Sequence, residues 1–427
     1  MTWPTEKLGK ICEERKEKNV KNLNLPVYAI SNIFGFVISE EFFSKKVYSN
    51  SLRTYKLVYK NDFAYNPARA NVGSIALFKN DTPGLISPMY TVFSIKEKKL
   101  LNADFLFYLL KTDFYQSQIK NLAASRGSIR QTLKLEDLFN LEIPLLPLHI
   151  QQKIVKVLDT IQSAIEIQEK IIEKTKELKK SLMNLLFHYG IKALSIKLLT
   201  SYRVGELRSE ELEKLGLKLK KTEIGEIPEH WDVGRLREVI EKPQYGITTK
   251  AINEDTGVKF LRITDIQDEK VNWNSLPFSK CTEEELNKYG IKEKDIVVAR
   301  IGATTGKSFF VNSTLKCVFG SYLIRIRAKS NLYPDFLNYY FQSTLYWSQL
   351  NLAKGEKLKG GINIPVLENL KIPLPPLPEQ QEIAEILQTI DQKIEIEKRK
   401  KELYEELFKT MLNKIMSQEI DINLLNY

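Results

Sequence analysis

The sequence of 427 residues carries a formal net charge of +11 and has a pI near 9.1. Hydrophobic residues make up 43% and charged residues 27%, which is typical of soluble globular proteins and excludes a wholly disordered chain. Three widely spaced cysteines exclude a disulfide framework, and no apolar run reaches the ~18 residues that a membrane span needs. We therefore expect a cytoplasmic protein of two or three domains.

The basic excess is distributed unevenly along the chain. Residues 1–147 hold 21 basic and 14 acidic side chains, whereas residues 374–427 hold 7 basic and 11 acidic ones. A basic surface favours a polyanionic partner such as nucleic acid, because each neutralised phosphate releases counterions. Many basic proteins bind no nucleic acid, so the charge by itself leaves the partner open.

The first half of the chain begins with short elements of mixed type. Residues 74–78 and 91–95 are rich in β-branched and aromatic side chains, which predicts strands. Residues 104–115 predict an aromatic-rich helix. The block that they form is therefore expected to be mixed α/β.

One long helix is predicted to end the first half. Pro144 and Pro147 are expected to stop a strand and to start the helix, where the entry and first turn tolerate proline. Residues 148–189 contain neither proline nor glycine, and 40 residues without these helix breakers predict a continuous helix. Residues 191–220 are charged with scattered leucines and are interpreted as a connector, with a short helix at 209–216.

The second half repeats this organisation. A helix rich in aromatic residues is predicted at 335–349, and a second long helix without proline or glycine at 379–418. A cluster of prolines again precedes the long helix. The predicted strands of this half are residues 259–263, 295–300, 307–311 and 322–327.

The chain contains an internal duplication. When residues 141–167 are placed over residues 370–396, 15 of 27 positions are identical, far more than chance allows. Further matches lie upstream, at Asp104 over Asp335, Tyr115 over Tyr346, Trp3 over Trp231 and Leu8 over Leu236. The period of about 230 residues is too long for a solenoid repeat, so it indicates a duplicated domain followed by a helix.

Both long helices carry apolar residues at alternating spacings of four and three, the heptad pattern of a coiled coil. Each stripe turns polar near its middle. Either each helix packs on its own domain, or the two pack on each other and the polar centre fixes their register; we favour pairing. The expected helix–helix packing residues are Ile154, Leu158, Ile161, Ile165, Ile172, Leu182, Ile383, Leu387, Ile390, Ile394, Phe408 and Met411.

These patterns predict a mixed α/β (α+β) protein with a pseudo-twofold internal repeat, in which two similar globular domains are separated by two long antiparallel helices that form a coiled coil. The expected segments are a first domain at 1–145, a long helix at 146–190, a connector at 191–220, a second domain at 221–373, a second helix at 374–420 and a tail at 421–427.

Two short motifs resemble catalytic signatures but do not satisfy them. Residues 302–308 read GATTGKS, one residue shorter than a phosphate-binding P-loop, and the residues that follow predict a strand, so we expect a turn between strands. The segment from Asn66 to Arg69 resembles the Asn-Pro-Pro-aromatic loop of amino-methyltransferases, but it lacks the second proline and the aromatic residue. The three histidines are isolated, and no nucleophilic or metal-binding constellation can be assembled, which favours binding over catalysis.

The two proline-to-helix junctions, IPLLPLHIQQ and IPLPPLPEQQ, resemble the specificity (S) subunit of type I restriction-modification systems. The IGEIPEHW preamble at 224–231, the segment DIVVARIG at 295–302 and NPARANVG at 66–73 resemble the same family. His149 and Ile150 replace the Pro-Glu pair usual before Gln-Gln, and the first half lacks the preamble. The resemblance extends from Trp3 to about Met416.

This resemblance implies a non-catalytic protein with two target recognition domains, each reading half of a split double-stranded DNA site, while the helices set the gap between the halves. It also implies partners: two methyltransferase (modification) subunits that use S-adenosylmethionine to methylate adenine N6, and restriction subunits that use ATP and Mg²⁺. No cofactor or metal is expected on this chain itself.

The expected DNA contacts are basic and polar residues near turns, which can reach phosphates and base edges. They are Arg69, Arg126, Arg130, Arg300, Thr304, Thr305, Lys307, Lys357 and Lys359. The alternative for each is an ordinary surface charge beside a turn. The sequence also leaves two other classes open: a DNA-modifying enzyme that acts alone, and a coiled-coil scaffold whose domains bind protein.

Overall fold

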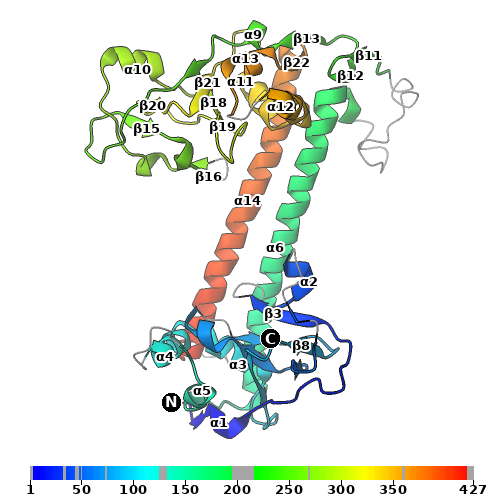
Figure 1. The fold of residues 1–427 in the computed structure, drawn as a ribbon, viewed down its shortest axis with the longest axis vertical. Coiled ribbons are helices and arrows are strands. Elements are labelled where there is room, and N and C mark those ends of the chain that lie inside the picture. Colours follow the sequence, from blue (N-terminus) through cyan, green and yellow to red (C-terminus); the bar gives the residue numbers. More distant parts are fainter. Residues whose placement is uncertain are drawn as a thin grey trace. The chain divides into compact units, whose positions relative to one another are not determined.

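The computed structural model describes residues 3–31, 35–43, 48–49, 51–72, 75–124, 132–194, 216–267, 270–357 and 361–420. The chain divides into a first unit, Met1–Glu169 with Arg399–Tyr427, and a second unit, Lys170–Lys398. Each unit holds one domain and parts of both long helices, which Figure 1 labels α6 and α14. None of the helices in the described ranges is long and apolar enough to cross a membrane.

The first domain is built on two four-stranded sheets, with strand orders β2-β9-β6-β7 and β4-β3-β8-β5. Only β3 and β8 pair in parallel among these described strands, and β1 pairs separately with β10. The strands are β1 (Thr5–Lys7), β2 (Cys12–Glu14), β3 (Val27–Ser31), β4 (Gly35–Ile38), β5 (Lys56–Val58), β6 (Phe63–Tyr65), β7 (Ala76–Leu77), β8 (Gly84–Ile86), β9 (Thr91–Ile95) and β10 (Glu142–Pro144). The helices are α1 (Leu8–Ile11), α2 (Ser39–Phe42), the 3-10 helix η1 (Pro67–Val72), α3 (Ala103–Leu110), α4 (Asp113–Ala124) and α5 (Leu135–Phe139).

The second domain has one four-stranded sheet of order β14-β21-β18-β19 and four strand pairs, of which β15–β20 is parallel. Its strands are β11 (Leu219–Thr222), β12 (Gly225–Pro228), β13 (Asp232–Arg235), β14 (Gln244–Tyr245), β15 (Lys259–Leu261), β16 (Ile266–Gln267), β17 (Lys270–Val271), β18 (Ile296–Ala299), β19 (Ser308–Phe310), β20 (Cys317–Phe319), β21 (Leu323–Ile326) and β22 (Lys371–Leu374). Its helices are α9 (Leu236–Val239), η2 (Ile263–Asp265), η3 (Trp273–Ser275), α10 (Glu283–Tyr289), α11 (Pro334–Gln342), α12 (Thr344–Lys357) and α13 (Ile364–Asn369).

The two domains share one plan, which confirms the duplication. The sheet order β2-β9-β6-β7 of the first domain is the order β14-β21-β18-β19 of the second. Each domain also has, near its start, a strand that pairs antiparallel with the strand before its long helix, β1 with β10 and β13 with β22. In both domains the matched leucine is the first residue of the helix that follows this strand. The Leu8 amide donates to the Leu141 carbonyl, and the Leu236 amide to the Leu370 carbonyl, both at 2.9 Å.

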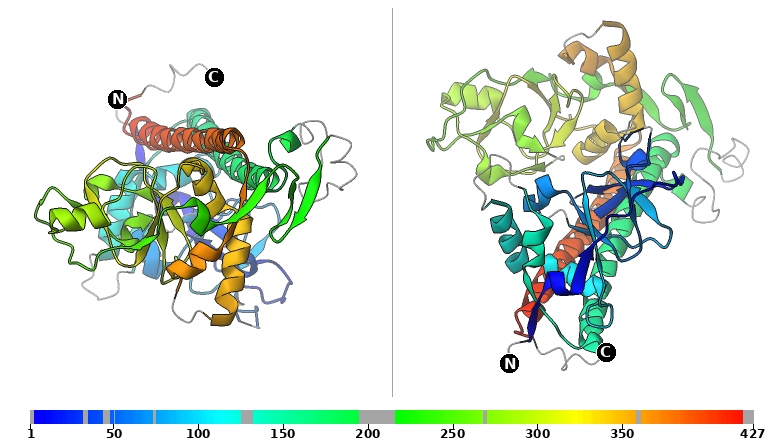
Figure 2. Two further views of the ribbon diagram at one scale, coloured as in Figure 1. Left: turned by 90° about the horizontal axis from the view of Figure 1, so that it is seen from above. Right: turned by 60° about the horizontal axis from the view of Figure 1, so that its bottom comes forward.

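The helices α6 (Leu148–Tyr189) and α14 (Leu377–Met416) are continuous over 42 and 40 residues, as the stretches free of proline and glycine predicted. Pro378 lies in the first turn of α14, where a helix tolerates proline. In the first unit, Ile154 near the start of α6 shares a hydrophobic core with Ile415 near the end of α14. In the second unit, Leu186 near the end of α6 shares a core with Ile383 near the start of α14. The helices therefore run antiparallel within each unit, and they lie side by side in Figure 1 and Figure 2.

The predicted heptad positions are buried or half-buried. The buried ones are Ile154, Leu158, Ile165, Ile172, Ile383, Leu387 and Ile394, and the half-buried ones are Ile161, Leu182, Ile390, Phe408 and Met411. The polar middle of each stripe is buried as well, at Gln168 on α6 and Glu397 on α14. The Glu397 carboxylate forms an ion pair with the Lys393 ammonium of the same helix at 3.1 Å. This ion pair offsets the cost of burying the Glu397 charge.

The prediction of single helices at 104–115 and 335–349 is wrong, because each of these segments contains two helices. The first breaks after α3 at Thr112, whose hydroxyl accepts a hydrogen bond from the Tyr115 amide at 3.3 Å. The second breaks at Ser343, whose hydroxyl accepts from the Tyr346 amide, also at 3.3 Å. A buried hydroxyl that caps the following helix ends the preceding one. The prediction of a helix at 209–216 falls almost wholly outside the described residues.

Candidate nucleic-acid interface

Equivalent loops connect equivalent strands in the two domains. In the first domain, η1 (Pro67–Val72) joins β6 to β7, and it carries the exposed Arg69. In the second, residues 300–307 join β18 to β19 and carry Arg300, Thr304, Thr305 and Lys307. The fold thus places these five predicted DNA contacts in corresponding loops, which we call the contact loops. No repeat was visible there in the sequence.

The Asn-Pro motif of the first loop has a structural role. The Asn66 side chain accepts a hydrogen bond from the Ala68 amide at 3.0 Å, and the Asn66 carbonyl accepts one from the Arg69 amide at 2.9 Å. Such an asparagine turn starts a short helix and presents the residue after the turn on the surface. The motif therefore positions Arg69.

The glycine-rich motif of the second loop is a turn between antiparallel strands, as its sequence predicted. Gly302 and Gly306 have φ angles of +79° and +93°, which favour glycine. A side-chain carbon at Gly306 would come within 2.5 Å of Leu350, and the Gly306 carbonyl accepts a hydrogen bond from the Tyr346 hydroxyl at 2.8 Å. The Thr305 hydroxyl closes the turn by donating to the Gly302 carbonyl at 2.7 Å.

Arg300 is anchored at the base of this loop. Its guanidinium carbon lies 4.6 Å from the centre of the Tyr245 ring, and its Nη1 donates to the Ser321 carbonyl at 3.3 Å. The Arg300 side chain is half-buried, whereas Lys307 at the other end of the loop is exposed. Lys307 is therefore better placed than Arg300 for a phosphate contact.

Described residues that come after α4 and α12 in the chain contact the same two loops. The Leu133 amide donates to the Pro67 carbonyl at 3.0 Å, and the Ile362 amide donates to the Arg300 carbonyl at 2.7 Å. Arg126, Arg130 and Lys359 lie outside the described residues, and Lys357 is the last residue of α12, with its side chain outside the described part. Leu133 and Ile362, which follow the predicted basic contacts in the sequence, thus lie beside the two loops.

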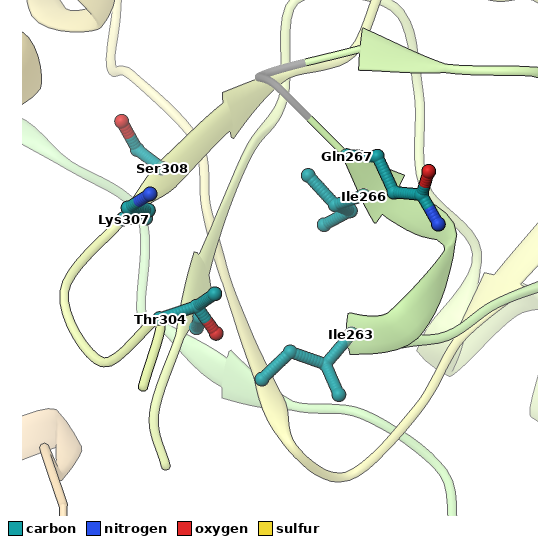
Figure 3. A pocket seen from close by; sticks show the side chains of 7 residues that line it. Ile263, Ile266, Gln267, Thr304, Lys307 and Ser308 are labelled. Carbon is teal, nitrogen blue, oxygen red and sulfur yellow. The ribbon is translucent and has the colours of Figure 1, made fainter. Parts of the chain in front are cut away.

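The second domain has a hollow beside its contact loop, with a volume of about 530 Å³. Figure 3 shows Ile263, Ile266 and Gln267 on one side of this hollow, and Thr304, Lys307 and Ser308 on the other. Ala299 at the end of β18 also lines it. Sequence reasoning found only Thr304 and Lys307, because the other side comes from η2 and β16, which carry no motif.

A buried glutamine fastens each domain to its long helix. In the first unit, the Gln151 amide group accepts from the Asn102 amide at 2.8 Å and donates to the Leu100 and Leu146 carbonyls at 2.7 and 2.8 Å. Gln380, its equivalent, accepts from the Tyr333 amide at 2.8 Å. Gln380 also donates to the carbonyls of Pro375, at 2.9 Å, and Asn331, at 3.4 Å. We call this arrangement the glutamine clasp; the sequence contained its signal, the repeated Gln-Gln pair, but not its function.

A tyrosine hydroxyl makes a second link in each unit. Tyr108 donates to Asp159 on α6 at 2.5 Å, and Tyr339 donates to Asp391 on α14 at 2.9 Å. Burial and the neighbouring carboxylate raise the pKa of both tyrosines far above its usual range, so both remain protonated donors. The domains are thus held on the helices by buried polar contacts as well as by apolar packing.

Comparison with known proteins places this architecture among DNA-specificity proteins. Residues 2–177 and 228–406 match the family described as the type I restriction modification DNA specificity domain. The chain is 30% identical over 380 residues to the type I restriction enzyme MjaVIII specificity subunit of Methanocaldococcus jannaschii, covering 87% of this chain and 82% of that protein. It is 23% identical over 299 residues to the EcoKI specificity subunit of Escherichia coli K12, covering 68% of this chain and 59% of that protein.

Solved structures show the same fold. The S subunit of a type I restriction-modification system from M. genitalium aligns with a TM-score of 0.53 at 15% identity, covering 97% of this chain and 96% of that one. A chain from a structure of type I R-M complex assembly and conformational transition aligns with a TM-score of 0.55 at 19% identity, covering 97% of both chains.

Proposed function

Because the chain belongs to the family of type I restriction-modification DNA specificity proteins, we propose that each of its two domains reads one half of a bipartite DNA site. The observation that carries the proposal is the pair of equivalent loops, at β6–β7 and β18–β19, on two sheets of the same strand order. Two related reading surfaces suit two half-sites, and the divergence of the loops suits different base sequences. The chain is a recognition subunit and not the catalytic part of its system.

The charge of the loops supports binding to the DNA backbone. Arg69 and Lys307 are exposed, and further basic residues follow α4 and α12 in the sequence. Lysine and arginine supply the phosphate contacts that position a protein on a duplex, while polar side chains read base edges in the major groove. We assign Arg69, Lys307 and the basic segments at 126–130 and 357–359 to phosphate contacts.

We assign the spacing of the half-sites to the long helices. A 42-residue helix is about 63 Å long, at roughly 1.5 Å per residue. Major-groove faces on one side of a duplex recur about every 34 Å. Helices of this length suffice to hold two readers at separate grooves with unread base pairs between them.

The outer faces of the helices suit a protein partner. In the first unit, Leu403 and Leu407 of α14 are 48% and 44% exposed although they lie within the long helix, and Ile167 of α6 is 57% exposed. Exposed apolar residues outside the buried heptad stripe favour a binding site for another protein. We propose that two modification subunits dock here, and that restriction subunits join through the complex.

The chemistry then belongs to these partners. Modification subunits would use S-adenosylmethionine, and restriction subunits would use ATP and Mg²⁺, while this chain binds none of them. We place the assembled complex in the cytoplasm, where it would act on the genome.

Expression of the chain with its modification subunits in a methylation-free host tests the proposal. We expect sequencing of modified bases to reveal N6-methyladenine in a motif of two short defined segments separated by an undefined gap. Chain and modification subunits expressed separately serve as controls and should leave the DNA unmodified. A methylated motif without a gap, or methylation by the chain alone, would contradict the proposal.

A further inference from the structure

The hollow beside the second contact loop has an apolar side, formed by Ile263 and Ile266, that is only partly covered; we call this side the floor. Ile263 and Ile266 pack from η2 and β16 against the core cluster that contains Leu261, Val297 and Phe309. Both isoleucines stay half-exposed, because the opposite wall of the hollow is a turn rather than another packed element. Exposed branched side chains over a firm core can bury additional apolar atoms of a ligand.

Polar groups surround this floor, and none of them has a partner in the part of the chain that the structure describes. They are the Gln267 amide, the Thr304 and Ser308 hydroxyls and the Lys307 ammonium. Other polar side chains of these segments are used internally: Thr305 closes the turn, and Arg262 donates two hydrogen bonds to Asp265 at 2.9 and 2.7 Å. These bonds raise the pKa of the Arg262 guanidinium and keep its donors occupied.

An apolar floor bordered by unused donors and acceptors matches one feature of the major groove. Thymine presents a C5-methyl group beside its O4 acceptor, and the adenine paired with it presents an N6 donor and an N7 acceptor. Isoleucine and threonine methyl groups suit the thymine methyl, and a glutamine amide suits the adenine edge. A G·C pair offers no methyl group for the floor.

We propose that the second domain reads an A·T base pair through this hollow, with Ile263, Ile266 and the Thr304 methyl against the thymine methyl group. Gln267 at the rim contacts the polar edge of the same pair, and Lys307 contacts a neighbouring phosphate. The inference rests on the proposed reading of half-sites, which it deepens by naming one kind of base pair and the side chains that select it.

Replacement of thymine by uracil tests the contact, because uracil lacks only the methyl group. Once the bipartite motif is known, duplexes with deoxyuridine at one thymine at a time are bound to the full chain in complex with its modification subunits. At one position of one half-site, the dissociation constant should rise about fourfold, the effect of a single methyl group removed from water. Uracil in the gap should have no effect.

Protein variants connect that position to the hollow. In Ile266→Ala, and in the milder Ile266→Val, the ratio between thymine and uracil duplexes should fall toward one, because the methyl group loses its contact. Ile252→Ala is the matched control, since Ile252 is a half-buried isoleucine of the same domain that does not line the hollow. It should keep the fourfold ratio. Lys307→Ala should weaken both duplexes equally.

The outcomes separate this inference from the proposed function. Specific binding to a bipartite site with no sensitive thymine would overturn the inference and leave half-site reading intact. A sensitive thymine whose ratio Ile266→Ala does not change would also overturn it, since the methyl contact would then lie elsewhere. Binding without any sequence preference would overturn both.

Discussion

The two junctions between a domain and the long helices share their hydrogen bonds but are closed by different side chains. In the first unit, Phe408 of α14 packs edge-on against Tyr108, with ring centres 5.7 Å apart. In the second, the equivalent repeat position is Lys179 of α6, whose ammonium lies 5.2 Å from the centre of the Tyr339 ring and 2.7 Å from Asp391. The tyrosine ring is therefore covered by an aromatic side chain in the first unit and by a charged lysine in the second; we call this covering contact the closure of the junction.

This difference shows which contacts stayed the same in the two copies of the duplicated domain and which changed. The clasps of Gln151 and Gln380 satisfy main-chain groups that are buried wherever this junction forms, and few other side chains have both a donor and an acceptor of that reach. The tyrosine ring requires only that its face be covered, which either an aromatic ring or a cation can do. The clasp therefore persists in both copies, whereas the closure has changed.

Equal changes in both halves should have the largest effect on function. Removing one heptad from each helix at equivalent repeat positions, 167–173 and 396–402, keeps the phase of the seam and shortens each helix by about 10 Å. The undefined gap of the methylated motif should shorten by about three base pairs, and methylation of the original motif should be lost. Inserting one heptad at the same places should lengthen the gap equally. Modified-base sequencing that returned the original gap would refute the helices as spacers.

The shared clasp should matter equally in both units. Gln151→Ala and Gln380→Ala each leave three buried main-chain groups without a partner, so each should lower the free energy of unfolding by about 3 kcal/mol. The neighbouring exposed glutamines provide matched controls, since Gln152→Ala and Gln381→Ala should cost less than about 0.5 kcal/mol. Urea denaturation of the full chain measures both sets. Similar losses from the buried and exposed glutamines would show that the hydrogen bonds of the clasp do not stabilise the junction.

The different closures should separate under salt. Phe408→Ala removes a half-buried ring and should cost about 2 kcal/mol at any ionic strength. Lys179→Ala should cost about 1 kcal/mol in dilute buffer and less in 1 M salt, because screening weakens its ion pair in the native protein. Lys180→Ala, one residue along and exposed, is the control for lost charge. If the cost of Lys179→Ala did not change with salt, its contacts with Tyr339 and with the Gln342 side chain, to which it donates at 2.9 Å, would hold the junction rather than the ion pair with Asp391.

The smallest effects are expected in the basic segments that follow α4 and α12 in the sequence. Replacing Lys357 and Lys359 together with alanine should reduce the salt dependence of DNA binding by about one unit of logarithmic slope for each lost phosphate contact. Arg126→Ala with Arg130→Ala tests the corresponding segment of the first domain in the same way. Gel-shift titrations between low and moderate salt measure the slope. An unchanged slope in either double variant would place its side chains away from DNA.

The sequence by itself determined the parts of this protein that depend on local pattern. The heptad spacing and the absence of proline and glycine gave both helices and their buried stripe, because a helix places residues three and four apart on one face. The repeated junction revealed the duplication. Local pattern failed to predict the helix breaks at Thr112 and Ser343, where one side-chain hydroxyl caps the next helix. Threonine and serine also occur within helices, so their presence alone does not predict a break.

Only the tertiary structure decided what each reading surface contains. It placed Arg69 and the 300–307 loop at corresponding positions of two sheets, although the loops share no recognisable sequence. It also brought Gln267 opposite Thr304, across strands that are distant in the chain. Such contacts depend on how strands are ordered and on where turns end, and the residues that line a hollow need no regular spacing. A one-dimensional pattern therefore revealed the helices that carry the domains, while the recognition chemistry emerged only from the fold.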